Sequence, residues 1–207
     1  MTHALLARDT GTTRPALALP GGFALDQGRV HEGCGPARHV FAALVAGAAQ
    51  AASGGEVLWI APEWAGARLN PEGLRRFADP GRMLFATPRR EEDLLWCAEE
   101  ALRAGCLALV VAELPTCPAL TPVRRLQLAA EAGAATAGPV PLGLLLTPGA
   151  GGARGAETRW WMAPAHAPTA EGWRLERRRA RRAPPARWHL AWEGGGRLAA
   201  TAQAMAD

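Results

Sequence analysis

Short apolar runs mark the first three quarters of the chain. Three of them are rich in branched residues, Val57–Ile60, Leu107–Val111 and Leu142–Leu146, and a further short run lies at Met83–Ala86. Continuous apolar runs rich in branched residues are typical of parallel strands that are covered on both faces. Together with a short strand at Arg29–Cys34, they predict a buried, mainly parallel sheet.

Helical patterns separate these strands. Between Glu91 and Ala104, leucines and alanines recur on one side, acidic residues fill the first turn and Gly105 follows, so we expect a helix there. We expect another helix to open at Thr121–Pro122, an N-cap followed by proline, and to close at Gly133. The alternation of strands and helices predicts an α/β fold with right-handed crossovers.

The carboxyl-terminal part changes character. Thr158–Met162, Trp173–Arg177 and Arg187–Trp192 are expected to be short strands, the last two alternating in polarity and joined by a turn at Pro184–Pro185. We expect them to extend the parallel sheet as antiparallel edge strands. The last dozen residues are expected to form a loosely held tail.

The junction at Gly35–Phe41 precedes an alanine-rich run, Ala37–Gln50, that predicts a helix ended by Gly54–Gly55. Many α/β proteins carry a phosphate-binding loop at such a junction. That loop uses a lysine and a Ser/Thr hydroxyl, yet the junction has neither and the chain contains no lysine. One interpretation is a weak, degenerate phosphate site made by Gly35, Pro36, Ala37, Arg38 and His39. In it, Arg38 replaces the lysine. We favour the other, a relic turn kept for packing, because arginine cannot coordinate magnesium.

Length and composition fit one globular domain. The chain has 207 residues, 49% apolar and 20% charged, and we expect a single domain at 17–194 between a flexible arm at 1–16 and a tail at 195–207. Its four cysteines lack CxxC spacing and its five histidines lack an HExxH pattern, so neither a disulfide framework nor a metal or other cofactor is expected. No apolar stretch reaches bilayer length, so we expect a cytoplasmic protein without membrane contact.

Arginine accounts for all 23 basic residues, and its distribution is uneven. The segment Trp173–Trp188 holds seven arginines against Glu176, a local net charge of +6, so the rest of the chain carries −2. A partner- or nucleic-acid-binding surface is predicted at Trp173, Arg177, Arg178, Arg179, Arg181 and Arg182. In a regular strand, Arg177, Arg179 and Arg181 would share one face, with Arg178 and Arg182 on the other. A merely solvated charged face remains the alternative.

The adjacent Trp160 and Trp161 point to opposite faces of an extended strand, so at most one of them joins a given core. The other is either an interface candidate or covered by a helix or the tail.

These features resemble the RecA-like fold and, within it, the ImuA family of bacterial proteins associated with SOS-induced translesion synthesis. The resemblance covers roughly residues 17–194. Four stretches carry it: Gly28–Glu32 with Gly35–Pro36, preceded by Leu19–Gly22; Val57–Glu63; Arg89–Arg103 followed by Leu109–Leu114; and Arg124–Glu131. It implies a three-layer α/β fold. Glu63 falls where RecA places its water-activating glutamate, whereas Ala112 replaces a magnesium-directing aspartate.

The resemblance implies a non-catalytic adaptor in error-prone translesion synthesis, not an enzyme. Its implied partners are an ImuB-like inactive Y-family polymerase, an error-prone C-family polymerase, RecA, and DNA through a weak contact. The alternative is an ATP-binding ATPase of the RecA superfamily, in which Arg38 binds phosphate and Glu63 orients water. A third alternative is a SulA-like cell-division inhibitor, although the helix at Arg89–Arg103 favours ImuA.

Overall fold

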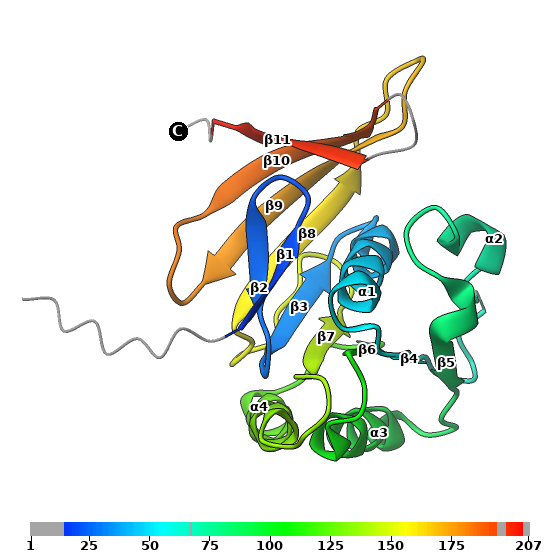
Figure 1. Cartoon of the computed structure of the whole chain (residues 1–207), viewed down its shortest axis with the longest axis vertical. Coiled ribbons are helices and arrows are strands. Elements are labelled where there is room, and N and C mark those ends of the chain that lie inside the picture. The colour runs from blue at the N-terminus through cyan, green and yellow to red at the C-terminus, as the bar shows by residue number, and fades with distance from the viewer. Residues whose placement is uncertain (1–14, 67, 194–197, 205–207) are drawn as a thin grey trace, which may run out of the picture.

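The computed structural model describes residues 15–66, 68–193 and 198–204. Its main feature is a sheet of nine strands, counted over these residues, in the order β11-β10-β9-β8-β3-β7-β6-β4-β5 (Figure 1). The strands are β3 (Val30–Cys34), β4 (Val57–Ile60), β5 (Met83–Ala86), β6 (Leu109–Glu113), β7 (Leu142–Leu146), β8 (Thr158–Pro164), β9 (Gly172–Ala180), β10 (Ala186–Trp192) and β11 (Leu198–Gln203). Neighbours from β5 to β8 pair parallel. Neighbours from β8 to β11 pair antiparallel. The predicted mainly parallel sheet with an antiparallel carboxyl-terminal extension is confirmed.

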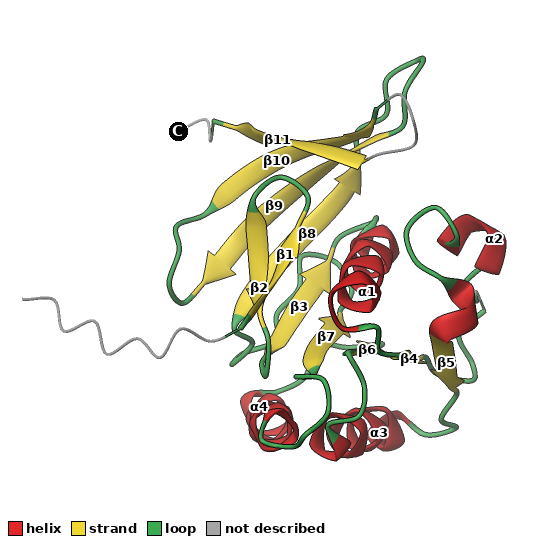
Figure 2. Ribbon diagram, viewed as in Figure 1, coloured by secondary structure: helices red, strands yellow, loops and turns green. Residues whose placement is uncertain are grey.

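Helices cover both faces of the parallel part (Figure 2). On one face lies α1 (Arg38–Ser53), and on the other α3 (Glu91–Ala104) and α4 (Leu120–Ala134) lie side by side. The sequence of β7 is apolar throughout because both faces of the strand are buried. Leu144 packs in the core on the α1 side, and Leu145 packs in the core on the α3–α4 side. The result is a mixed α/β fold that is compatible with three layers.

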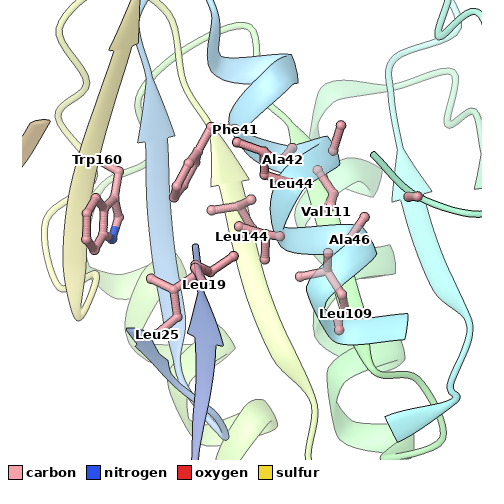
Figure 3. Packing of buried hydrophobic residues seen from close by; sticks show 14 of the residues in the cluster. Leu19, Leu25, Phe41, Ala42, Leu44, Ala46, Leu109, Val111, Leu144 and Trp160 are labelled. Atoms are coloured by element: carbon pink, nitrogen blue, oxygen red, sulfur yellow. The ribbon is translucent and has the colours of Figure 1, made fainter. Parts of the chain in front are cut away.

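A hairpin that the sequence did not predict extends the α1 layer. It consists of β1 (Ala16–Leu19) and β2 (Phe23–Asp26), which pair antiparallel. Figure 3 shows Leu19 and Leu25 of the hairpin beside Trp160 of β8, with Phe41 of α1 close by. The hairpin therefore covers one face of the antiparallel strands and makes that face part of the core.

The helix ends show which sequence signals were reliable. Helix α3 has the predicted bounds and ends at Gly105 with a φ of +62°. Helix α4 begins at Leu120, so the predicted N-cap at Thr121 is wrong. Pro122 is tolerated because the first amides of a helix have no intrahelical partner. Gly133 lies inside α4 rather than ending it, and a Cβ there would lie 2.0 Å from the carbonyl oxygen of Leu102. That glycine lets α4 approach α3 closely.

Two further short elements, α2 (Pro71–Leu74) and the 3₁₀ helix η1 (Pro80–Arg82), lie between β4 and β5. The prediction of a loose tail is wrong for Leu198–Gln203, which pairs with β10 as β11. Residues 1–14 of the predicted arm lie outside the described residues, and Ala16 already begins β1. Within the described ranges, none of the helices combines the length and the apolar character needed to cross a bilayer.

Candidate functional site

The junction between β3 and α1 lies at the carboxyl ends of the parallel strands, where open α/β sheets bind ligands. The amide of Gly35 donates to the carbonyl of Gly149 at 3.0 Å, and that of Ala37 donates to Met162 at 3.0 Å. Gly35 has a φ of +90°, and a Cβ on it would lie 2.4 Å from the Met162 carbonyl oxygen. Phosphate loops rely on free amides. Two amides of this loop already serve to join β3 to neighbouring segments.

The rest of the predicted phosphate site makes a different contact. Pro36 is exposed, and Arg38 and His39 are half-buried in the first turn of α1. Nε2 of His39 lies 3.0 Å from Oε2 of Glu113, and Nε1 of Trp59 donates to Oε1 of the same carboxylate at 2.6 Å. Burial alone would raise the pKa of Glu113, but the hydrogen bonds from His39 and Trp59 lower it overall. His39 thus ties the start of α1 to the end of β6.

The resemblance described above implies that Glu63 and Ala112 correspond to the water-activating and magnesium-directing carboxylates of an ATPase. Glu63 follows β4, and its side chain is 47% exposed and 3.1 Å from Nε of Arg89 in an ion pair. Ala112 is buried in β6 and packs in the core on the α3–α4 side. Ala112 therefore contributes packing, and Glu63 is solvent-facing.

A cavity of about 250 Å³ adjoins Glu113 at the carboxyl ends of β4, β5 and β6. It is lined mainly by apolar residues, among them Trp59, Leu69 and Phe85, and also by Arg68. Phe85 is 57% exposed on the edge strand β5. Sequence reasoning missed this cavity, because its lining comes from separate segments that only the fold brings together.

The arginine-rich segment forms β9 and the turn after it, but its side chains do not alternate as expected. Residues Arg177–Arg179 lie opposite only Trp160 and Arg159 of β8, an irregularity of the β-bulge kind. Arg177 pairs with Trp160, whereas Arg179 pairs with Arg159 on the opposite face. The prediction that Arg177 and Arg179 share a face is therefore wrong.

Two residues of the predicted interface are structural. Trp173 is 6% exposed and packs against Phe77 at a ring-centroid distance of 6.1 Å, so its assignment to an exposed surface is wrong. Arg177 lies over the rings of Trp160 and Trp188 and donates to the carbonyl of Pro184 from Nε at 3.1 Å and Nη2 at 3.0 Å. Burial lowers the pKa of Arg177. Its role is to fix the turn between β9 and β10.

The other arginines of the predicted set are exposed. Arg178 and Arg179 stand on β9, and Arg181 and Arg182 lie in the turn that follows it. Nε of Arg181 lies 3.7 Å from Oε2 of Glu157, near the start of β8. Of the predicted set, Trp173 and Arg177 thus have structural roles, whereas the other four arginines are exposed, two on β9 and two in the turn after it.

The open face of β8, β9 and β10 carries a cluster that we call the basic sheet face: Trp161, Arg174, Glu176, Arg178 and Arg187. The guanidinium carbons of Arg174 and Arg178 lie 4.9 and 4.2 Å from the ring centroid of Trp161. Glu176 alone pairs with three arginines, Arg174 at 3.2 Å, Arg178 at 2.9 Å and Arg187 at 3.3 Å. The cluster therefore has an excess of positive charge. In Figure 1, α3 lies well away from β9 and β10.

Trp160 and Trp161 take the opposite faces that the sequence predicted. Trp160 is fully buried and Trp161 partly exposed. The adjacent tryptophans were thus the available sequence signal for the basic sheet face. Arg174 and Arg187 were missed, because they lie outside the densest arginine run.

A buried carboxylate fixes the β7–β8 loop beside this face. Glu32 of β3 accepts hydrogen bonds from Thr147 Oγ1 at 2.7 Å, from the amides of Gly152 and Ala153 at 2.6 and 2.8 Å, and from Arg159 Nε at 2.5 Å. Burial alone would raise the pKa of Glu32, but these hydrogen bonds outweigh burial and lower it. The loop that precedes Trp161 is therefore held from inside.

Fold and surface together define a mixed α/β protein with an aromatic, arginine-rich sheet face. No protein-family model matches the chain, and no curated protein matches it. Among solved structures it is similar to the crystal structure of SulA from Pseudomonas aeruginosa, with 22% sequence identity and a TM-score of 0.45 over 58% of this chain and 98% of that chain. A likeness this distant carries no argument about function.

Proposed function

We propose that this chain is a non-catalytic adaptor in the bacterial SOS response, acting in error-prone translesion synthesis. Its partner is an ImuB-like inactive Y-family polymerase, with RecA, a C-family polymerase and DNA as further contacts. The pathway rests on the sequence resemblance to ImuA. The binding role rests on the basic sheet face.

The observation that carries the binding role is the position of Trp161 between Arg174 and Arg178. An aromatic ring flanked by guanidinium groups suits an acidic protein surface or a nucleic-acid strand, because it offers both apolar contact and charge. Tryptophan and arginine are also the residues most enriched at binding hot spots. Glu176 supplies one carboxylate for three guanidinium groups, so further acidic groups are attracted.

The lack of ATPase activity in this proposal is supported by the β3–α1 junction. The amides of Gly35 and Ala37 donate to main-chain carbonyls, and His39 is engaged by Glu113. A bound phosphate would have to displace these contacts without help from a lysine. Arg38 is then a helix-start residue rather than a phosphate ligand.

Co-purification with the ImuB-like protein of the same organism tests the proposal. We expect the double variant Arg174→Glu/Arg178→Glu to lose the partner, while Arg75→Glu, an exposed substitution at the end of α2, serves as a charge-reversal control and retains it. Fluorescence anisotropy with single-stranded oligonucleotides measures the DNA contact separately. If the double variant binds both partner and DNA as the wild type does, the proposed surface is wrong.

A further inference from the structure

A groove of about 570 Å³ lies beside the basic sheet face, between α4 and the end of β9. One wall is the outer stripe of α4, with Leu120, Arg124 and Leu128 spaced four residues apart and hence on one helix face. The other wall contains Arg154 of the β7–β8 loop and Arg179 of β9. The groove is therefore built from segments that are distant in the sequence.

The floor of this groove is fixed by Gln127 of α4. Its amide nitrogen donates to the carbonyls of Val30 at 3.0 Å and Gly155 at 3.1 Å, and its oxygen accepts from the amide of Val30 at 3.1 Å. These bonds tie α4 to β3 and to the loop that forms the opposite wall. The groove is thus preorganised, which lowers the entropic cost of binding.

Charge in the groove is unbalanced. Five arginines and two glutamates line it, a surplus of three positive charges. The two glutamates are already engaged, Glu131 by Arg29, and Glu157 by Arg29 and Arg181. Three exposed arginines form no salt bridge with any residue in the described ranges: Arg124, Arg154 and Arg179. The groove therefore attracts carboxylates or phosphates.

Apolar surface distinguishes between these two ligands. Leu120 is 36% exposed and Leu128 is 65% exposed, one on each side of Arg124 along α4. Two leucines eight residues apart on a helix are separated by about 12 Å along its axis. A phosphate backbone would leave both leucines in water, whereas an amphipathic peptide covers them with its own apolar side chains. The combination favours a peptide.

We propose that this groove binds an acidic, amphipathic helical segment of a protein partner. Apolar side chains of the segment cover Leu120 and Leu128, and its carboxylates pair with Arg124, Arg154 and Arg179. The proposal does not depend on the pathway named above or on the basic sheet face. It assigns a second docking site to the same side of the molecule.

Panning a displayed random peptide library against the full chain tests this proposal. We expect the enriched peptides, about 16 residues long, to carry carboxylates and to repeat apolar residues at helical spacing. One enriched peptide, labelled with fluorescein, and a scrambled version of the same composition are then titrated by anisotropy. Scrambling is expected to weaken binding about tenfold or more, because it removes the apolar face.

Variants assign the binding to the groove. Arg124→Glu/Arg154→Glu and Leu120→Ser/Leu128→Ser are each expected to weaken the peptide about tenfold. The controls Arg75→Glu and Leu84→Ser, both exposed and distant, leave it unchanged. Because all these side chains are exposed, circular dichroism should show wild-type folding.

The proposal is overturned if no acidic peptide is enriched, or if the groove variants bind as the wild type does. It is also overturned, in favour of nucleic acid, if oligo(dT) binds and loses affinity with the arginine variant but not with the leucine variant. The variant Arg174→Glu/Arg178→Glu keeps peptide binding under this proposal. The experiments therefore distinguish failure of the groove proposal from failure of the proposed role of the basic sheet face.

Discussion

The guanidinium carbon of Arg178 lies 4.2 Å from the ring centroid of Trp161 on the open face of the antiparallel strands. Arg178 lies over this ring on the open face, whereas its neighbour Arg177 lies over Trp160 on the other face, and the bulge places Arg179 on the face opposite to Arg177. A cation over an exposed indole stabilises a protein only modestly. We expect this pair to contribute more to binding than to stability, because the guanidinium and the ring are already positioned before a partner binds.

Truncating Trp161 should therefore change stability little. We expect Trp161→Ala to lower the free energy of unfolding by about 1 kcal/mol or less, since the ring is partly exposed. Urea denaturation measures this value. Trp160→Ala is the matched comparison. It should cost about 3 kcal/mol or more, because Trp160 is fully buried. Equal losses for the two variants would contradict the assignment of faces.

The network around Glu32 predicts a large loss on substitution. Glu32→Gln leaves the guanidinium of Arg159 without its partner carboxylate, and we expect about 3 kcal/mol of destabilisation. Because hydrogen bonds lower the pKa of Glu32 in the folded state, its contribution is fully present above its unfolded pKa, about 4.3, and is lost as pH falls through the folded value.

Unfolding experiments at neutral and acidic pH measure both effects of Glu32→Gln. The gap between variant and wild type should shrink in acid. Glu72→Gln, an exposed substitution, serves as the control and should show almost no gap. A gap for Glu32→Gln that stays constant down to about pH 3 would contradict a folded pKa below the usual value.

Buried His31 predicts a second pH effect. Burial lowers its pKa, partly offset by the hydrogen bond between Nε2 and the Asp26 carbonyl, so the folded protein holds a neutral imidazole. The unfolded chain takes up a proton below about pH 6.5, hence stability should fall as pH falls from about 7 to 5. His31→Gln should flatten this slope in urea titrations. An unchanged slope would show that another group is responsible.

Gly35 can be tested as a packing residue. Gly35→Ala must adopt a φ of +90° and place a Cβ 2.4 Å from the Met162 carbonyl oxygen, so we expect a loss of roughly 2 kcal/mol or more. Gly22→Ala is the control, because its φ is +76° but no atom lies within 4 Å of the added Cβ. If the two variants lose equal stability in thermal unfolding, close packing at Gly35 is not the reason for that glycine.

The β3–α1 junction predicts that ATP with magnesium gives no binding heat in calorimetry, and that Arg38→Ala changes nothing. The reason is that the amides of Gly35 and Ala37 are already hydrogen-bonded. Binding that Arg38→Ala abolishes would instead favour the ATPase alternative.

The parallel strands and α3 could be predicted because local signals agreed there. Helix α3 combines acidic residues in its first turn, an apolar stripe and Gly105 in the left-handed conformation. Strand β11 was missed because its sequence, Leu198–Gln203, is rich in alanine and has little local preference for strand. Its structure comes from pairing with β10.

The candidate site was harder to predict. Trp173 was expected on the surface, but residues far away in the sequence, among them Phe77, cover it. The run Arg177–Arg179 contains no apolar residue that would fix which side chains face the core. The bulge therefore cannot be recognised in the pattern of apolar and polar residues. Trp161 could be inferred only as one of two alternatives, because a strand pattern does not say which face is covered.

The most direct test of the adaptor proposal is the dissociation constant for the ImuB-like partner, measured by calorimetry with wild type, Trp161→Ala and Trp96→Ala. Trp96 is 59% exposed on α3 and is the matched control for loss of a surface tryptophan. We predict that Trp161→Ala weakens binding about tenfold or more while Trp96→Ala stays within about twofold of wild type. Equal affinities of the wild type and Trp161→Ala would contradict the proposal.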